Sequence, residues 1–159
     1  MKPTVLDVCC GSRGFWFDRQ DQRTVFCDNR TGSYPVGDRA KPIIVRPDLR
    51  CDFTALPFSS SCFNIVVFDP PHLKRNGMLG DITKRYGILV EDWRGVFRKA
   101  FLECFRVLRS TGSLVLKWNS VEIPLSQVLE LTEQKPLIGH RTGKKAQTHW
   151  VLFNGVHKR

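Results

Sequence analysis

The sequence predicts an α/β fold: a mostly parallel, doubly wound sheet of seven strands whose last strand runs antiparallel. Three observations favour this class. Short apolar segments alternate with helical patterns along the 159 residues. The unbroken apolar run Ile65–Phe68 suits a strand that is covered on both faces. The two final strand-like segments are separated only by the turn TGKKA, residues 142–146, which predicts a closing hairpin.

The expected strands follow one another with short connections, and we expect residues 1–159 to form a single domain. A turn over Gly11–Gly14 should lead into a short helix that carries Phe15, Trp16 and Phe17. Residues 29–42 hold glycines and prolines and show no helical pattern, so we expect a loop. The strands are expected over residues 4–8, 24–28, within 43–52, 65–68, 113–118, 136–141 and 147–153.

The clearest helix lies in EDWRGVFRKAFLECFRVLRSTG, residues 91–112. Apolar residues from Trp93 to Leu108 recur at the helical spacing and form one sustained face, which indicates core packing. Acidic residues precede the first turn and basic residues occupy the last, as the helix dipole favours. Gly112 follows as the expected stop. A second, short helix is expected over residues 125–131.

The six cysteines lie inside or beside apolar runs at irregular spacing, and no CxxC pair occurs. This pattern favours buried, reduced thiols over disulfides or zinc ligands, so we predict no metal site. The chain contains no apolar stretch of membrane-spanning length and begins without the apolar segment of a signal peptide. We therefore expect a cytoplasmic protein without a membrane partner.

The charge balance points to a polyanionic partner. The chain carries 25 basic and 15 acidic residues, a formal net charge of +10. Such an excess is typical of proteins that bind nucleic acid, although a plain basic surface would show the same balance.

Carboxylates and glycine follow the expected strands, at the edge where ligands bind in doubly wound sheets. Gly11 lets the backbone approach a ligand closely after the first strand. Asp28 comes 17 residues later, a distance at which an acidic residue accepts hydrogen bonds from ribose hydroxyls. Asp52 follows the third strand, where it can meet an adenine amine. Asp69 follows the fourth, within Asp69-Pro70-Pro71-His72.

In this order and spacing, the segments VLDVCCGSRG, Asp28, CDFTALPFSSSCFNIVVFDPP and ECFRVLRSTGSLVLKW resemble the motifs of class I S-adenosylmethionine-dependent methyltransferases. The resemblance covers about residues 4–118 and implies a compact Rossmann-like fold with S-adenosylmethionine as cofactor. DPPH further resembles the motif of amino-methyltransferases that act on adenine N6 or cytosine N4. Compact phage-encoded methyltransferases are also similar.

The resemblance assigns the cofactor to residues at the strand ends. The usual G-x-G-x-G run falls on Cys9, Gly11 and Arg13, so only the middle glycine is kept, and Gly14 is a candidate replacement. The implied cofactor-binding residues are Asp7, Cys9, Gly11, Asp28, Asp52, Phe53 and Asp69.

The implied catalytic group is Asp69-Pro70-Pro71-His72. The Asp69 carboxylate and the Pro70 carbonyl would grip the amine hydrogens, while Pro71 helps to fix the backbone. Asp69 would also receive the proton. His72 would stack on a flipped base. The alternative for Asp69 is a simple turn start, which Asp-Pro often makes.

We expect DNA to be favoured over RNA, with adenine N6 as the preferred acceptor. Basic residues around the site would track phosphates: Lys74, Arg75, Lys144 and Lys145. One alternative is ribose 2′-O-methylation of RNA, because Asp69 and Lys117 resemble two members of a Lys-Asp-Lys-Glu tetrad. No acidic residue follows Glu133 to complete it. Another alternative is a degenerate, non-catalytic module that binds nucleic acid or a partner protein.

One face of the sheet is expected to be poorly covered, since the chain enters its first strand at once and residues 29–42 form no helix. A face of this kind leaves room for a second subunit, so we expect a homodimer.

Overall fold

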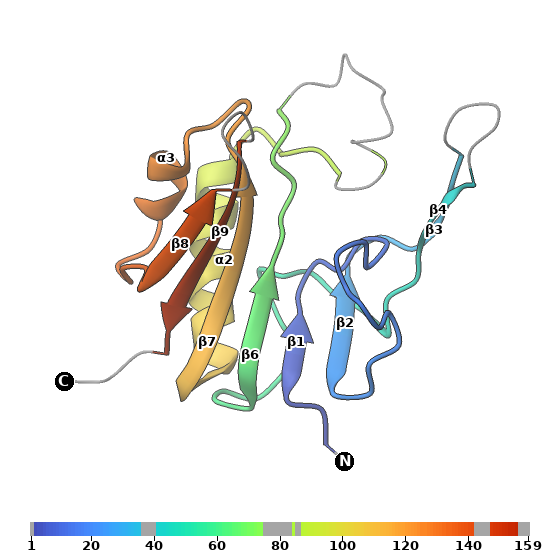
Figure 1. The fold of residues 1–159 in the computed structure, drawn as a ribbon, viewed down its shortest axis with the longest axis horizontal. Helices are drawn as coiled ribbons and strands as arrows, with labels where there is room; N and C mark the ends of the chain where they lie inside the picture. Colours follow the sequence, from blue (N-terminus) through green and yellow to red (C-terminus); the bar gives the residue numbers. More distant parts are fainter. Residues whose placement is uncertain (1, 36–40, 75–83, 85–86, 142–146, 156–159) are drawn as a thin grey trace.

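The structure, a computed structural model, describes residues 2–35, 41–74, 84, 87–141 and 147–155. Among these residues, seven strands form one sheet in the order β5-β2-β1-β6-β7-β9-β8 (Figure 1). The pairs from β5 to β7 are parallel, and β9 is antiparallel to both of its neighbours. The predicted fold class is thereby confirmed. The strands are β1 (Val5–Asp7), β2 (Thr24–Asp28), β5 (Leu49–Arg50), β6 (Phe63–Phe68), β7 (Leu108–Asn119), β8 (Ile138–Arg141) and β9 (Thr148–Asn154).

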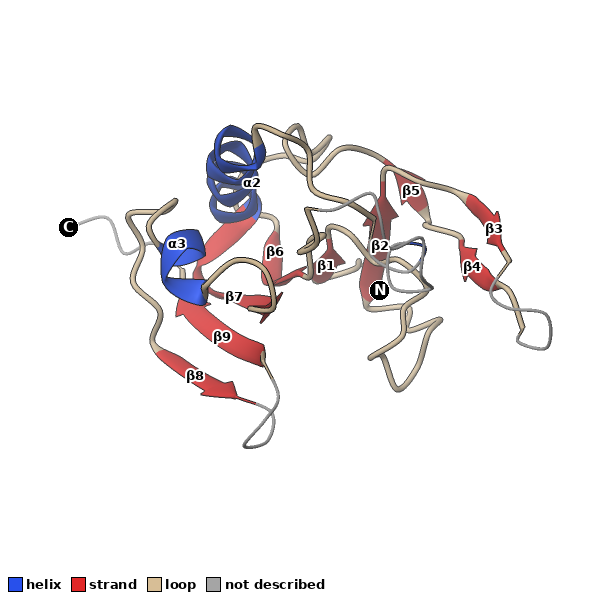
Figure 2. Ribbon diagram, turned by 90° about the horizontal axis from the view of Figure 1, so that it is seen from above, coloured by secondary structure: helices blue, strands red, loops and turns tan. Residues whose placement is uncertain are grey.

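The two described helices, α2 (Trp93–Val107) and α3 (Leu125–Leu129), lie on the same face of the sheet (Figure 2). The Asp92 carboxylate caps α2 by accepting a hydrogen bond from the Gly95 N–H at 3.0 Å. The apolar stripe of α2 faces the sheet, where the Phe68 ring lies 5.7 Å from Phe97 and 5.6 Å from Phe101. The stripe is core packing, as predicted.

The strand after α2 begins earlier than predicted. Leu108 is already extended and pairs with Phe63 of β6, so the expected helix end at Gly112 is wrong. Gly112 is required for a different reason, since a Cβ at this position would lie 2.6 Å from the Asn64 carbonyl oxygen. The two strands therefore approach too closely for a side chain there, at the irregularity between Phe63 and Ile65.

Two other local predictions are wrong. The segment 29–42 is not all loop, since β3 (Gly32–Tyr34) pairs antiparallel with β4 (Ile43–Val45) in a separate two-stranded sheet. The expected third strand within 43–52 is accordingly divided, and only β5 joins the main sheet.

No helix forms at the three consecutive aromatic residues after Gly14, because their side chains point to different surroundings. The Phe15 ring packs on Trp150 of β9 at 5.4 Å, and Trp16 packs on Phe26 of β2 at 5.0 Å. Phe17 is fully exposed. The chain instead runs through turns across the face of the sheet opposite α2.

That opposite face carries no helix among the described residues (Figures 1 and 2). Strand register places apolar side chains next to one another on it, alternating with those that face α2. We call these residues the open sheet face; all are partly or well exposed: Val5, Ile65, Val115, Leu152 and Ile138.

All six cysteines are free thiols. In the described part of the chain, no helix combines the length and the apolar character needed to cross a membrane.

Candidate active site

A cavity of about 440 Å³ opens beyond the carboxyl ends of β1, β2 and β6. Its wall brings together most of the residues that the sequence singles out, from four separate segments. It does not include Asp7, Pro70, His72 or Lys74. The predicted site residues that line it are Cys9, Gly11, Asp28, Asp52, Phe53, Asp69 and Pro71.

The turn after β1 forms although two of the expected glycines are missing. Gly11 has φ 50°, and its N–H donates to the Asp28 carboxylate at 2.8 Å. Arg13 also adopts a left-handed conformation, φ 56°, where a glycine would be easier. Its guanidinium is held by Asp48 at 2.8 Å and lies 3.8 Å from the centre of the Phe26 ring. These contacts, rather than Gly14, compensate for the lost glycine.

Asp28 lines the cavity but already has partners. Besides Gly11, it accepts hydrogen bonds from the Arg30 N–H at 2.9 Å and from the Arg30 guanidinium at 3.2 Å. A ribose would therefore share this carboxylate with Arg30, and the ribose contact stays a prediction. One oxygen of Asp52, Oδ1, accepts hydrogen bonds from the Thr54 N–H and hydroxyl, both at 2.8 Å. Its other oxygen has no hydrogen bond to any described residue.

Asp69 forms a buried ion pair with Lys117 of the neighbouring strand. The Lys117 ammonium lies 2.7 Å from Asp69 Oδ2, and the two side chains are 14% and 6% exposed. Burial raises the pKa of Asp69, while the Lys117 charge opposes that rise. Both residues line the cavity, so the pair presents a hydrogen-bond acceptor and a donor to it.

Aromatic rings surround this ion pair. The Lys117 ammonium lies 5.4 Å from the Phe15 ring and 5.9 Å from the Trp150 ring. Trp150 was missed by the sequence reasoning, and its pairing with Lys117 across β7 and β9 could not be read from spacing. Lys117 was named from the sequence only for the alternative of ribose methylation, although its place as a lone charge between the apolar Leu116 and Trp118 also marks it.

Asp7 lies behind the cavity wall. It is fully buried and accepts hydrogen bonds from the Trp16 indole at 2.8 Å and from the Cys9 N–H at 3.2 Å. Burial raises the pKa of Asp7 to about 7 against the opposing effect of these two bonds. Burial also raises the pKa of the Cys9 thiol well above its usual range, so this thiol stays protonated near neutral pH.

The prolines and histidine after Asp69 lie at different depths. Pro71 lines the cavity, whereas Pro70 is buried. His72 is 8% exposed, and its ring packs edge-on to Trp118 at 6.2 Å. Burial lowers the pKa of His72. Its stacking role stays a prediction that requires the ring to turn toward the cavity.

Of the predicted phosphate-contacting residues, only Lys74 lies within the described residues. Its side chain is exposed 5.6 Å from the Trp93 ring, and its N–H donates to Glu122 at 2.5 Å. Arg75, Lys144 and Lys145 lie outside the described residues.

Comparison with solved structures identifies the fold. No protein-family model and no curated protein sequence matches the chain. Solved structures do match. The PH0226 protein from Pyrococcus horikoshii OT3 is similar with a TM-score of 0.60 and 13% identity, over 98% of this chain and 83% of that one.

Two similar structures are described as S-adenosylmethionine-dependent methyltransferases. A TehB-like enzyme from Corynebacterium glutamicum matches with a TM-score of 0.57 and 15% identity, over 98% of this chain and 83% of that one. A protein from Methanosarcina mazei matches with a TM-score of 0.57 and 11% identity, over 99% and 94%. At these identities the likeness establishes the fold, which is the Rossmann-like fold found in these methyltransferases.

Proposed function

We propose that the protein transfers a methyl group from S-adenosylmethionine to an exocyclic amine of a nucleic acid base, with adenine N6 in DNA as the preferred acceptor. The observation that carries the proposal is the placement of Asp69. Its carboxylate lies at the end of β6, in the wall of a cavity in the crevice where this fold class binds its ligands.

The chemistry of the cavity fits the proposed cofactor. Its wall holds the carboxylates of Asp28, Asp52 and Asp69, which favour a ligand that carries a sulfonium charge. The apolar rings of Phe53 and Phe97 supply surface for a purine. Methyltransferases of similar fold use this cofactor, which supports the same assignment here.

The Asp69–Lys117 pair suits the edge of an amino-substituted base. In adenine and in cytosine, the exocyclic amine donates hydrogen bonds and the neighbouring ring nitrogen accepts them. Asp69 can accept from the amine while Lys117 donates to the ring nitrogen. Because Lys117 occupies only Oδ2 among the described contacts, Oδ1 of Asp69 remains available to the base.

The residues then have defined roles in the transfer. By holding the amine hydrogens, Asp69 turns the nitrogen lone pair toward the methyl group. When bound, the cofactor would supply the methyl group from its sulfonium, and the S–C bonding pair would stay on sulfur while the nitrogen lone pair makes the N–C bond. Asp69, which would hold the amine hydrogens, can accept the proton that the methylated nitrogen must lose. Lys117 counters the effect of burial and favours the ionised form of Asp69 that this role requires.

A nucleic acid substrate is supported by the formal net charge of +10 and by the resemblance of DPPH to the motif of amino-methyltransferases. Phe15, which lines the cavity close to Lys117, offers a ring against which a flipped base could pack.

Ribose 2′-O-methylation of RNA is the second candidate, favoured by the same 2.7 Å contact between Asp69 and Lys117. A neutral ribose hydroxyl is a weak nucleophile. Methyl transfer to it therefore needs a base that removes the hydroxyl proton. Lys117 already donates to Asp69 Oδ2 at 2.7 Å, so the geometry presents it as a hydrogen-bond donor and not as that base. We therefore rank amine transfer first.

The test is incubation with methyl-labelled S-adenosylmethionine and with DNA and RNA separately, followed by mass spectrometry of the digested nucleosides. We expect N6-methyladenine from DNA. N4-methylcytosine would keep the amine chemistry and change the base. Only 2′-O-methyl nucleosides would establish the second candidate, and cofactor binding without any product would indicate a non-catalytic module.

We also propose that the open sheet face pairs with the same face of a second copy. Five side chains, spaced about 4.8 Å from strand to strand and each covering about 7 Å along its strand, present on the order of 160 Å², about a fifth of the roughly 800 Å² that each partner buries in a typical interface. The patch would thus be the apolar core of an interface with a polar rim. None of its residues is charged, so two copies of net charge +10 can meet there without direct repulsion.

Sedimentation velocity tests this pairing. Ile65→Lys should convert a dimer to a monomer, because it places a charge within the apolar patch. The matched control is Leu102→Lys on the outer side of α2, where the leucine is 71% exposed, and it should leave the dimer intact. A monomeric wild type would contradict the proposal.

A further inference from the structure

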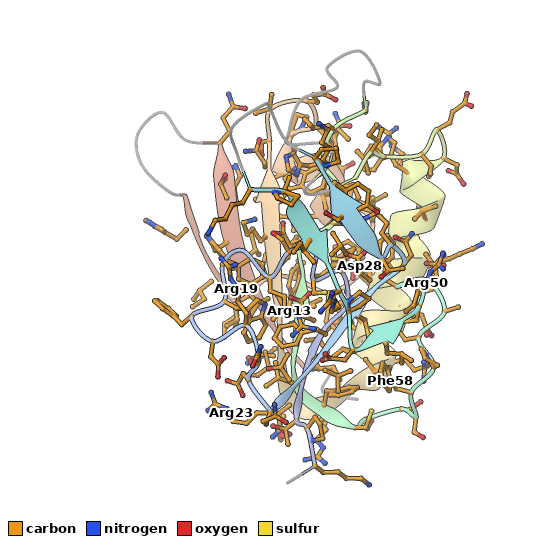
Figure 3. The ribbon with its side chains drawn as sticks, turned by 90° about the vertical axis from the view of Figure 1, so that its right-hand side faces the viewer. Arg13, Arg19, Arg23, Asp28, Arg50 and Phe58 are labelled. Carbon is orange, nitrogen blue, oxygen red and sulfur yellow. The ribbon has the colours of Figure 1, made fainter. Side chains whose placement is uncertain are left out.

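A second cavity, of about 670 Å³, lies on the other side of the turn after β1. Gly11 and Ser12 line both cavities, so this turn is a shared wall. The remaining wall comes from the segment that leads into β2 and from residues 44–48. Figure 3 looks onto this edge of the sheet, where Arg13 and Arg19 lie close together.

Arg13 joins the walls of this arginine-lined cavity. Its guanidinium donates to the backbone carbonyls of Arg19 and Arg46, at 2.5 and 2.8 Å, and to the Asp48 carboxylate at 2.8 Å. The guanidinium is thereby occupied by protein partners and by the Phe26 ring. Arg13 therefore has a structural role: it joins the segment of Arg19 to the segment of Arg46 through their backbone carbonyls.

The charges that remain for a ligand are positive. The side chains of Arg19 and Arg46 are exposed, and neither has a hydrogen bond or ion pair with any described residue. Both carboxylates in the wall are already paired, Asp48 with Arg13 and Asp21 with Arg23 at 2.5 Å. The cavity therefore presents two unpaired guanidinium groups and no unpaired carboxylate among the described residues.

A buried hydroxyl adds an independent observation. Thr24 lines the same cavity, is 6% exposed, and its Oγ1 has no hydrogen-bond partner among the described residues. Buried hydroxyls are rarely left without a partner, so a polar group beside Thr24 would satisfy this atom.

We propose that this cavity binds a backbone phosphodiester of the nucleic acid substrate, held between Arg19 and Arg46. Planar guanidinium groups form paired hydrogen bonds with phosphate oxygens, and a phosphodiester carries the negative charge that the cavity lacks. The shared wall places this contact next to the cofactor cavity, so one strand can reach both. The inference rests on the proposed function, since it assumes that the substrate is a nucleic acid.

The experiment measures fluorescence anisotropy of a labelled oligonucleotide from 50 to 200 mM salt. The double variant Arg19→Gln/Arg46→Gln removes both cations that hold the one phosphodiester and should reduce the log–log salt slope by about 0.7–0.9, the contribution of a single phosphate contact. The matched control is Arg98→Gln/Lys99→Gln, which removes the same charge from exposed positions on α2 and should keep the wild-type slope.

Each outcome has a distinct meaning. An unchanged slope in the Arg19/Arg46 variant, or an equal fall in both variants, overturns the phosphate site. Wild-type protein that binds no oligonucleotide overturns the nucleic acid substrate itself. In a second arm, inorganic phosphate is added at constant ionic strength. Displacement of the oligonucleotide at low millimolar phosphate would assign the cavity to the free ion, whereas weak displacement supports the backbone contact.

Discussion

The two cavities that share the Gly11–Ser12 turn differ in the charge they leave unpaired. In the first, Asp28 and Asp69 are partly neutralised by Arg30 and Lys117, yet Asp52 keeps a free carboxylate oxygen. In the second, the carboxylates are paired and arginines remain. One cavity thus suits a cation such as a sulfonium, and the other suits an anion.

This difference has a structural cause. The first cavity lies at the ends of central, parallel strands, where the buried carboxylates Asp28 and Asp69 each have a cationic partner because an unpaired buried charge is costly. The second lies at the sheet edge, where Arg19 and Arg46 keep contact with water and need none. Substitutions on the buried side should therefore have larger effects than substitutions at the edge.

The largest effect is expected from Asp69→Asn. The amide cannot accept the proton and presents a donor to the amine, so the rate constant for methyl transfer should fall by about 10²–10⁴. Cofactor affinity should change by only a few-fold. Single-turnover kinetics and calorimetry on the same protein measure the two quantities. Glu133→Gln, an exposed carboxylate away from both cavities, is the control, and an active Asp69→Asn variant would refute the assigned role.

Asp7→Asn should change how stability depends on pH. The pKa of Asp7 is about 7 in the folded protein and 3.8 in a model compound. Between these values the folded state retains a proton that the unfolded state has lost, so the free energy of unfolding should fall as pH rises from about 4 to about 7. Asparagine removes this contribution while its amide oxygen can still accept the Trp16 hydrogen bond.

Urea unfolding at pH 4.5 and pH 8 measures the difference between wild type and Asp7→Asn. The variant should gain relative stability at pH 8, with an upper limit on the order of 4 kcal/mol for a shift of about three pKa units. Asp69, whose pKa burial also raises, should leave both proteins with a residual slope of the same sign. A stability difference that is constant across pH would show that Asp7 is ionised throughout.

The smallest effect is expected from Asp28→Ala. The substitution removes the proposed ribose acceptor, and hydrogen bonds to a charged group contribute roughly 1.5–3 kcal/mol, which corresponds to about 10- to 150-fold in affinity. Since Asp28 also binds Gly11 and Arg30, Arg30→Gln separates the two roles. It should leave affinity for the cofactor equal or higher, because the carboxylate would then be shared with fewer partners. Equal losses in both variants would indicate that Asp28 only shapes the turn.

The sequence predicted the central strands, the long helix and the carboxylates at the strand ends, because these depend on local pattern. Ile65–Phe68 and the stripe of α2 pack as their periodicity requires. The hairpin of β3 and β4 was missed because it is stabilised by pairing between Gly32–Tyr34 and Ile43–Val45, which no local signal records. The helix expected at Phe15–Phe17 failed because contacts with β2 and β9 outweigh local propensity.

The candidate site shows the same division. Asp69 and Asp28 could be placed from their positions after strands, since parallel strands bring their ends together. The partners that set their charge, Lys117 and Arg30, depend on side-chain packing, and so does the burial of Asp7 behind the cavity wall. Arg13 takes the place of a glycine in the turn after β1 and is held there by Asp48. These two residues lie 35 positions apart, so their pairing could not be read from local sequence.

The central claim is that the cavity at the ends of β1, β2 and β6 holds S-adenosylmethionine. The most direct measurement is a calorimetric titration of the wild-type protein with S-adenosylmethionine, repeated with Phe53→Lys, which places a charge in the cavity wall. We expect one molecule bound per chain to the wild type, and binding reduced at least tenfold in the variant. Wild-type protein that releases no heat of binding, or a variant that binds as tightly as the wild type, would contradict the account.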